Sequence, residues 1–354
     1  MEPMAGEPRR ILVRATNWVG DAVMSLPALL ALRRRFPQAF IAVAARPWVL
    51  DLYRLEPAVD ELVCYGAPKG FRGLSAQWRF ARGLSRRGFD CAVLFPNAFE
   101  AAWIAWAARI PRRIGYARDG RGFLLTEAIT APEAGEIPSH ERYYYLELLR
   151  RAGLIDVLPQ VDSIRLGRAD EARQAGLRKF RELGASGPVI GVSPGAAFGS
   201  AKRWLPERFA QAAASIAGHL GASVAVFGAP AEAELCETVA QLARELGAHA
   251  LNLGGATGLA GFIELAAACD IFLTNDSGAM HIASALNVPT VAVFGATDPA
   301  ATGPAGPACR VVREPVECAP CLLRECPIDH RCMTRVTAQR VAEEALGLLK
   351  ALRS

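Results

Sequence analysis

The feature of this sequence that most limits its fold is a regular alternation of short β-rich runs with segments of helical periodicity. In the first half, the runs that we predict as strands cover residues 11–16, 40–44, 61–65, 91–95 and 113–116. The amphipathic segments between them predict helices over residues 22–35, 48–55, 77–86 and 99–108. Strands that alternate with helices form mostly parallel sheets covered by helices, so the expected fold class is α/β.

The same alternation restarts after a polar region that contains one predicted helix over residues 169–183. Further strands are predicted over residues 189–192, 223–227, 250–253, 271–274 and 290–294. Because 354 residues exceed what one hydrophobic core usually supports, we expect two domains. The expected divisions are a first domain over residues 1–165, a linker region over 166–187, a second domain over 188–335 and a closing helix over 336–354. Two doubly wound Rossmann-like units that face each other would enclose a central cleft, with ligands beyond the carboxyl ends of the strands.

The composition places the chain among soluble globular proteins, since 52% of its residues are hydrophobic and 21% are charged. The sequence has no run of about 20 apolar residues that could span a membrane and no apolar stretch of a signal peptide near Met1, so we expect a cytoplasmic protein. The first half is basic: up to Gln160 it has 22 Lys and Arg against 16 Asp and Glu. This charge predicts an anionic partner, either phosphate-bearing or a membrane surface, although solvated helix faces explain much of it equally well.

One turn in the second half has the properties of an anion site. In Ile271 to Leu286, IFLTNDSGAMHIASAL, an apolar strand ends at a polar turn and a helix follows. Unpaired N–H groups at the start of that helix can bind a phosphate, and Gly278 lets the phosphate approach the backbone. Asp276 would repel a phosphate, so it either caps the helix or faces the hydroxyls of a neutral part of a ligand. A capped structural helix is the alternative interpretation of this turn.

The loop after the first strand of the second half offers a cation to the same ligand. It reads SPGAAFGSAKRW, and its small residues permit close approach of a phosphate while Lys202 supplies a point charge. Neither the spacing of a P-loop nor that of a dinucleotide fingerprint is present. A solvated lysine before a helix at Pro206 is the simpler alternative.

A carboxylate occupies the corresponding place in the first half. The strand over residues 11–16 leads into Asn17-Trp18-Val19-Gly20-Asp21, and an apolar-periodic helix follows. In the transfer of a sugar to a hydroxyl group, Asp21 could take the acceptor proton while the anomeric carbon develops oxocarbenium character. Capping of the helix is the competing role for Asp21.

Four of the nine cysteines gather before the last helix. Cys318, Cys321, Cys326 and Cys332, with His330 close by, resemble a metal-binding spacing, but all would come from one short loop. A structural metal, a reversible disulfide and simple packing all stay open for this loop, and we expect no catalytic metal there.

These motifs together resemble glycosyltransferase family 9, the bacterial lipopolysaccharide heptosyltransferases, and most closely the heptosyltransferase II group. The resemblance covers nearly the whole chain. It rests on five blocks in order: ILVRATNWVGDAVMSLPAL, LFPNAFEAAWIAWAARIPRRIGY, SPGAAFGSAKRWLPERFA, NLGGATGL and TNDSGAMHIASALNVPTVAVFGATDP.

The resemblance implies a GT-B fold and the transfer of L-glycero-D-manno-heptose from ADP-heptose to the first heptose of a lipid A-linked inner core. The transfer would be inverting, with no metal, no cofactor and no nucleic-acid partner. It implies that Asp21 is the catalytic base and that Lys202 binds the diphosphate. The other donor-site residues that it implies are Ser277, Gly278 and Ala279 through their amides, Asp276 toward donor hydroxyls, His281 in the donor pocket, and Glu232 and Thr257 near the nucleoside.

The implied phosphate loop departs from the pattern of some family members, and the implied acceptor side has no motif of its own. Some relatives carry hydroxyl residues where this chain has Ala197 and Phe198, so Ser200 or backbone amides would replace them. An acceptor rich in carboxylates and phosphates would give the basic first half a purpose, with a peripheral position at the inner membrane. The candidate acceptor residues are Arg112, Arg113, Arg118 and Arg121.

Other functions are also compatible with these motifs. The alternatives are heptosyltransferase I or III, another sugar transferase on this scaffold, a nucleotide-sugar epimerase and a non-catalytic binder of nucleotide sugars.

Overall fold

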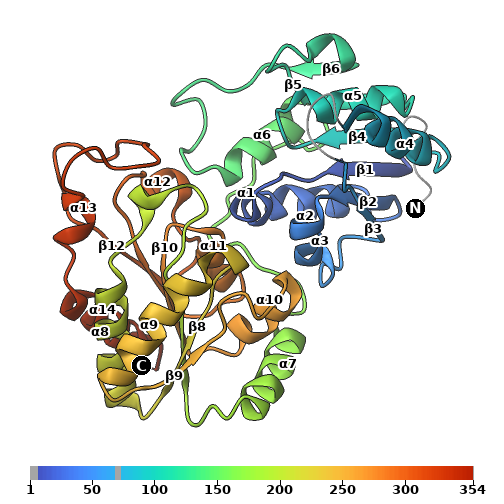
Figure 1. Ribbon diagram of the computed structural model, residues 1–354. Helices are drawn as coiled ribbons and strands as arrows, with labels where there is room; N and C mark the ends of the chain where they lie inside the picture. Colours follow the sequence, from blue (N-terminus) through green and yellow to red (C-terminus); the bar gives the residue numbers. More distant parts are fainter. Residues whose placement is uncertain (1–6, 68–72, 354) are drawn as a thin grey trace. The chain divides into compact units, whose positions relative to one another are not determined.

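The computed structural model describes residues 7–67 and 73–353, and its contacts divide the chain into two units. Unit 1 runs to Val161 and unit 2 begins at Asp162. Each unit is a parallel sheet with helices on both faces (Figure 1). Within the described part of the chain, no helix is long and apolar enough to cross a membrane.

Unit 1 contains a sheet of six parallel strands in the order β3-β2-β1-β4-β5-β6. Its strands are β1 (Arg10–Arg14), β2 (Phe40–Ala45), β3 (Glu61–Cys64), β4 (Cys91–Leu94), β5 (Arg112–Tyr116) and β6 (Glu127–Ile129). Its helices are α1 (Val19–Met24), α2 (Leu26–Arg35), α3 (Pro47–Leu50), η1 (Asp51–Tyr53), α4 (Leu74–Ser85), α5 (Phe99–Ala107), η3 (Gly122–Leu124) and α6 (Arg142–Arg151).

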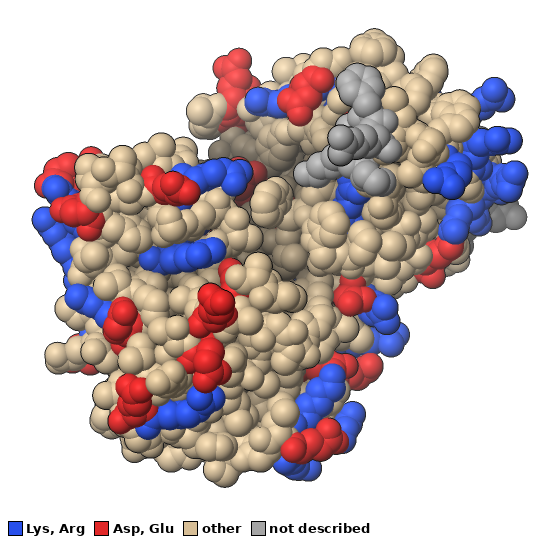
Figure 2. Space-filling view, viewed as in Figure 1, with Lys and Arg blue, Asp and Glu red and all other residues tan. Residues whose placement is uncertain are grey.

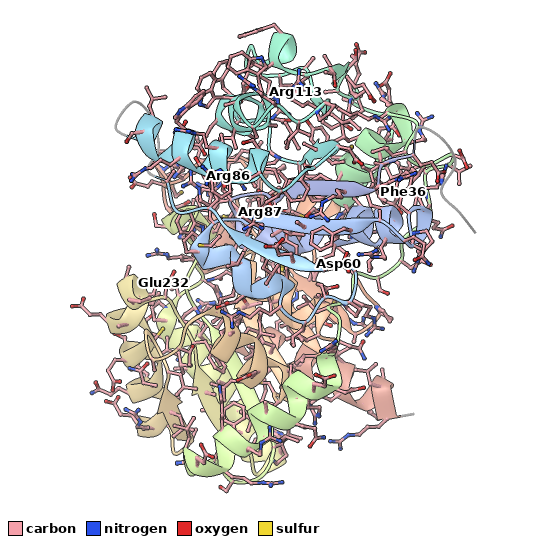
Figure 3. The ribbon with its side chains drawn as sticks, turned by 90° about the vertical axis from the view of Figure 1, so that its right-hand side faces the viewer. Phe36, Asp60, Arg86, Arg87, Arg113 and Glu232 are labelled. Carbon is pink, nitrogen blue, oxygen red and sulfur yellow. The ribbon has the colours of Figure 1, made fainter. Side chains whose placement is uncertain are left out.

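The core of unit 1 explains why these segments fold as they do. The central strands β1, β2 and β4 are buried along almost their whole length, which is typical of parallel strands covered on both faces. Helices α4 and α5 pack against each other and share one hydrophobic cluster with this sheet, whereas α2 packs against α6. At the start of β2, the Asp60 carboxylate accepts a hydrogen bond of 2.7 Å from the Ile41 N–H and pairs with Arg33 at 2.5 Å (Figure 3).

Unit 2 repeats the topology of unit 1 without repeating its sequence. Its order, β9-β8-β7-β10-β11-β12, is again the 3-2-1-4-5-6 arrangement of a Rossmann sheet. Its strands are β7 (Val189–Ser193), β8 (Ser223–Val226), β9 (His249–Asn252), β10 (Ile271–Asn275), β11 (Thr290–Val293) and β12 (Cys309–Val312). Its helices are α7 (Ala169–Glu182), η4 (Ser200–Lys202), α8 (Pro206–Leu220), η5 (Pro230–Glu232), α9 (Ala233–Glu245), α10 (Leu259–Ala267), α11 (Gly278–Ala285), α12 (Pro299–Thr302), α13 (Arg331–Thr334) and α14 (Ala338–Arg353).

Two helices in unit 2 differ from the expected division of the chain. The region over residues 166–187, expected as a linker, contains α7, which packs closely on α10: a Cβ at Gly176 would lie 1.9 Å from the backbone oxygen of Glu264. The expected closing helix is α14, which packs on α8, β11 and β12 inside unit 2. Both helices are therefore parts of this unit's two helical layers.

The predicted α/β class and all ten predicted strands are confirmed, with shifts of one or two residues at their ends. The predicted helix over residues 22–35 is two helices, because the chain breaks at Ser25 and restarts with Pro27 in the first turn of α2. The edge strands β6 and β12 were not predicted. Both are short and partly exposed, so neither has the apolar run that marks a buried strand.

Candidate functional site

The candidate site of unit 2 lies where its strand order reverses. Strands β7 and β10 are neighbours at the centre of the sheet, and their following loops leave from the same edge. In doubly wound sheets this switch point is the usual place for a ligand. The loop after β7 carries Lys202, and the turn after β10 carries Asp276.

Lys202 and Asp276 form an ion pair at this switch point. Lys202 Nζ lies 2.5 Å from Asp276 Oδ2, and the two side chains are only 12% and 5% exposed. The Thr297 hydroxyl donates to the same oxygen at 2.6 Å, from the loop after β11. Among the described residues, no donor is hydrogen-bonded to Asp276 Oδ1. The positive charge of Lys202 therefore compensates the negative charge of Asp276, which allows this carboxylate to lie beside a turn that suits an anion.

The Asn275 side chain fixes both ends of the Lys202 loop. Its Oδ1 accepts a hydrogen bond of 2.9 Å from the Trp204 N–H, and its Nδ2 donates one of 2.7 Å to the Pro194 carbonyl. Asn275 is completely buried, and so is nearly all of the Trp204 ring. The last residue of β10 therefore sets the path of the loop that follows β7.

The turn after β10 leads directly into α11. Ser277 is the N-cap residue, in extended conformation, and its hydroxyl lies 3.2 Å from that of Thr274 instead of capping the helix. Asp276 precedes the cap and pairs with Lys202, so it does not take the capping role that was one of its two predicted alternatives. The first amides of α11, including those of Gly278 and Ala279, lack intrahelical partners. His281 is buried in the next turn of the same helix.

The other predicted donor-site residues surround the same sheet edge less closely. Glu232 lies beside the start of the Lys202 loop, because a Cβ at Gly195 would come within 2.1 Å of Glu232 Oε1. Its Oε2 accepts a hydrogen bond of 3.0 Å from the Ala229 N–H after β8. Thr257 lies just before α10, with its side chain next to Gly261. Ser200 begins the short helix η4 that ends at Lys202.

The cysteine-rich loop supports the Lys202 loop from one side. The Arg324 carbonyl accepts a hydrogen bond of 2.9 Å from the Ala201 N–H, and His330 Nε2 lies 3.0 Å from the Ala201 carbonyl. The Phe198 ring has Lys202 Nζ 4.8 Å and the Arg324 guanidinium 5.1 Å from its centroid. No Cβ fits at Gly199, where it would lie 2.2 Å from the Arg324 carbonyl oxygen. The Lys202 loop and the cysteine-rich loop therefore pack tightly against each other.

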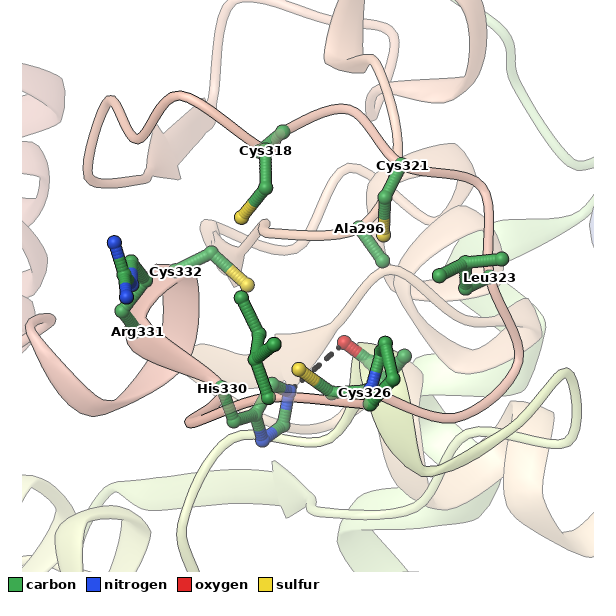
Figure 4. A pocket seen from close by; sticks show the side chains of 12 residues that line it. Ala296, Cys318, Cys321, Leu323, Cys326, His330, Arg331 and Cys332 are labelled. Carbon is green, nitrogen blue, oxygen red and sulfur yellow. Dashed lines mark hydrogen bonds between the residues drawn. The ribbon is translucent and has the colours of Figure 1, made fainter.

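The cysteines of that loop line a pocket with Ala296 and Leu323 (Figure 4). Cys318, Cys321, Cys326 and Cys332 are all free thiols, and burial with the nearby thiols raises the pKa of Cys332. Over residues 7–67 and 73–353, no group of three or more His, Cys, Asp or Glu residues is arranged to hold a metal ion. In the structure these four thiols are unpaired and pack around the pocket.

Unit 1 places Asp21 at its own switch point. Strands β1 and β4 are the central neighbours, and Asp21 lies in the first turn of α1, after the loop that follows β1. Burial raises the pKa of Glu141, and the negative charge of Asp21 raises it further. The position at a strand end is the one that the sequence predicts for Asp21.

Three of the four arginines predicted to contact an acceptor are occupied within unit 1. Arg112 pairs with Glu127 at 2.5 Å, and Arg113, labelled in Figure 3, donates to the Leu124 and Ile110 carbonyls at 2.8 and 2.6 Å. Arg121 is completely buried, and burial lowers its pKa to about 10. Its guanidinium donates to the Tyr116 carbonyl at 3.0 Å and to the Pro96 carbonyl.

These contacts correct the predicted acceptor surface. Arg121 has a structural role, because a fully buried guanidinium bound to backbone carbonyls does not face a ligand. Only Arg118 of the four is exposed. The sequence shows the positive charge of these residues, but burial depends on how the chain after β5 folds back.

Comparison with known proteins decides the family. The model of glycosyltransferase family 9 (heptosyltransferase) matches residues 77–331. The chain belongs to this family. The predicted resemblance is thereby confirmed, and the family 9 match includes both the Lys202 loop and the turn that carries Asp276.

Several family 9 heptosyltransferases are similar to the chain over nearly its whole length. Lipopolysaccharide heptosyltransferase 2 of Salmonella typhimurium is 33% identical over 96% of this chain and 98% of its own. Lipooligosaccharide heptosyltransferase 2 of Campylobacter jejuni serotype O:2 is 38% identical with the same coverage. The structure of E. coli ADP-heptose lps heptosyltransferase II has a TM-score of 0.81 and 30% identity, covering 98% of this chain and 100% of that one. The chain is therefore a family 9 heptosyltransferase with a GT-B-like fold, and these type II enzymes are similar to it over nearly its whole length.

Two residues of this site were not singled out in the sequence. Asn275 and Thr297 each stand inside a quoted motif block, the first in TNDSG and the second in FGATDP. Asn275 ends a buried strand and Thr297 lies in the loop after the next one, and a polar residue near such a strand end is a usable signal for a switch point. Their partners, however, lie on loops that are distant in the sequence.

Proposed function

We propose that the protein transfers L-glycero-D-manno-heptose from ADP-heptose to the first heptose of a lipid A-linked inner core, with inversion at the anomeric carbon. The observation that carries this proposal is the Lys202–Asp276 pair beside the first amides of α11. A cation with free amides suits a diphosphate, and a carboxylate suits sugar hydroxyls.

In the proposed donor complex, the diphosphate takes Lys202 away from Asp276. The amides of Ser277, Gly278 and Ala279 and the positive end of α11 then share the negative charge with the lysine. Asp276 is released toward the hydroxyls of the heptose. Glu232 and Thr257 would lie near the nucleoside, and His281 and Ser200 would line the donor pocket.

In the proposed reaction, the acceptor hydroxyl oxygen attacks the anomeric carbon as the bond from that carbon to ADP breaks. Asp21 takes the proton of the attacking hydroxyl, and ADP leaves with both electrons of the broken bond. Lys202 and the helix amides stabilise the charge that develops on the leaving diphosphate. One displacement from the face opposite ADP inverts the configuration, since no enzyme-bound sugar intermediate intervenes.

The acceptor and the location of the enzyme follow from the same proposal. A lipid A-linked acceptor would place the protein at the cytoplasmic face of the inner membrane as a peripheral protein. The positive charge of unit 1 supports this location, because anionic lipid surfaces attract basic segments.

Product analysis by mass spectrometry tests the proposed function. The protein is incubated with ADP-heptose and a panel of core acceptors that carry no heptose, one heptose or two heptoses. We expect one heptose to be added to the acceptor that carries one, with release of ADP. Addition to the heptose-free acceptor would indicate a type I enzyme, and addition only to the two-heptose acceptor a type III enzyme. A change in ADP-heptose without acceptor would indicate epimerisation.

A further inference from the structure

Helix α5 presents a stripe of aromatic side chains on its outer face. Phe99, Trp103 and Trp106 follow one another at intervals of four and three residues, so they share one side of the helix. Trp78 of α4 extends the stripe, with ring centroids 6.3 Å from Trp103, which in turn lies 5.2 Å from Trp106. Phe123 of η3 extends its other end, 6.2 Å from Phe99. We name these five residues the aromatic ridge.

The aromatic ridge is exposed to an unusual degree for side chains of its size. Phe123 is 76% exposed, Trp78 46%, and Phe99 and Trp106 45% each. Trp103 is partly buried and packs on the core of unit 1, so it anchors the others to the fold. Single exposed aromatic residues are common on proteins, but a continuous group marks an interaction surface.

The chain around the aromatic ridge is strongly basic. Residues 73–130 contain nine arginines and no lysine, against four acidic residues. Arg79 and Arg82 on α4 are exposed, as are Arg109 after α5 and Arg118 after β5. Figure 2 shows basic side chains gathered over the end of unit 1 that carries α4, and Figure 3 labels Arg86 there.

We propose that the aromatic ridge is the surface by which the protein binds an anionic lipid bilayer. Trp and Phe rings insert at the boundary between lipid headgroups and acyl chains, and arginines beside them pair with lipid phosphates. A second copy of this chain is a poorer occupant, because two ridges face to face would bring both sets of arginines together. The proposal deepens the proposed function, since that function requires a lipid-linked acceptor.

Binding to vesicles tests the aromatic ridge directly. The full-length protein is sedimented with vesicles that contain about a quarter phosphatidylglycerol in phosphatidylethanolamine, and with phosphatidylcholine vesicles, at low and high salt. We expect binding to the anionic vesicles that weakens with salt, and little binding to phosphatidylcholine. The double variant Trp106→Ser/Phe123→Ser should lower the affinity at least about tenfold. A matched double variant in other exposed apolar positions, Val157→Ser/Leu246→Ser, should bind as the unchanged protein does.

The charge contribution is tested with a second pair of variants. Arg79→Ala/Arg82→Ala removes two exposed charges beside the aromatic ridge, and Arg178→Ala/Arg181→Ala removes the same number from α7 in unit 2. We expect Arg79→Ala/Arg82→Ala to lower the affinity for vesicles and to make binding less sensitive to salt. Arg178→Ala/Arg181→Ala should change neither. Because these residues are exposed, this test holds even if the aromatic double variant fails to fold.

Fluorescence distinguishes insertion from any other association. Brominated lipids should quench the tryptophan emission of the bound protein, and Trp78→Phe/Trp106→Phe should keep binding but lose most of the quenching. Equal binding by Trp106→Ser/Phe123→Ser and the unchanged protein would overturn the proposal, and so would unchanged quenching in Trp78→Phe/Trp106→Phe. Ridge-dependent self-association or nucleic-acid binding without vesicle binding would also overturn it. Vesicle binding is measured without ADP-heptose, so its result does not depend on whether the proposed transfer reaction takes place.

Discussion

Lys202 and Asp276 form a nearly buried ion pair of 2.5 Å between two loops that leave the centre of one sheet. The pair explains how a carboxylate is kept beside a turn suited to phosphate. Because the two charges compensate each other, a diphosphate that binds Lys202 must also change the surroundings of Asp276. Donor binding and the orientation of Asp276 are therefore expected to depend on each other.

Removal of the lysine is expected to weaken donor binding. Lys202→Met should raise the KM for ADP-heptose about 10- to 100-fold, or about 1.4 to 2.7 kcal/mol, because the diphosphate loses its cation. It should also lower the melting temperature, since the Asp276 carboxylate stays buried without its partner. Steady-state kinetics with varied ADP-heptose and thermal unfolding measure the two effects.

A double variant separates these two effects. Lys202→Met/Asp276→Asn should recover much of the lost stability but none of the donor affinity. An unchanged KM in Lys202→Met would remove Lys202 from the phosphate site.

Thr297 is expected to act on the sugar part of the donor through Asp276. Its hydroxyl is hydrogen-bonded to Asp276 Oδ2 at 2.6 Å, which leaves Oδ1 for a ligand hydroxyl. Thr297→Val should therefore weaken ADP-heptose binding about tenfold while ADP binds as before, because ADP has no heptose to contact Asp276. Calorimetric titration with the two ligands measures the difference.

The matched control for Thr297 is Thr297→Ser, which keeps the hydroxyl and should bind both ligands almost normally. Equal weakening of ADP and ADP-heptose in Thr297→Val would argue against a specific role and for a general disturbance of the loop.

Loss of the Asn275 amide is expected to release the Lys202 loop. Asn275→Ala leaves the Trp204 N–H and the Pro194 carbonyl without partners in a buried place, which should cost about 2 to 4 kcal/mol of unfolding free energy. The KM for ADP-heptose should rise as well. Chemical unfolding and kinetics measure both, with Gln241→Ala, which removes an exposed amide, as the control. A stable variant with normal kinetics would show that the loop holds its path without Asn275.

The proposed base is tested by a change that keeps its shape. Asp21→Asn should retain ADP-heptose binding but lower kcat at least about 1000-fold, since the acceptor proton then has no carboxylate to receive it. Rapid-quench turnover and donor titration are measured on the same preparation. A loss of tenfold or less, about 1.4 kcal/mol, would exclude Asp21 as the base.

Glu141 is expected to make stability depend on pH. Burial, with the negative charge of Asp21, raises the pKa of Glu141 in the folded protein above its value in the unfolded chain. The folded state therefore holds this proton more tightly, so the contribution of Glu141 to stability is fully present below the unfolded pKa and is lost as the pH rises through the folded one. Glu141→Gln should raise the melting temperature at pH values above the folded pKa.

The same variant should have almost no effect below the pKa of an ordinary carboxyl group. Thermal unfolding of both proteins across this pH range gives the comparison. A constant difference at every pH would show that packing, and not the proton, accounts for the change.

All the strands except β6 and β12, their order of appearance and the polar turns that follow them were predictable. An apolar run of four or five residues and the turn after it are local features, so the segments over residues 189–192 and 271–274 were visible without any tertiary information. The motifs that hold Asp21, Lys202 and Asp276 were visible for the same reason, because each directly follows such a strand.

The contacts between those motifs depend on which strands become neighbours. Lys202 and Asp276 are 74 positions apart and meet only because β10 lies beside β7, and Thr297 joins them because β11 lies beside β10. Likewise, the sequence shows that Arg121 is charged and that Phe123 is apolar, yet the first is buried and the second exposed. Residue type and spacing fix local structure, whereas burial and pairing arise from packing between distant segments, which only the folded chain decides.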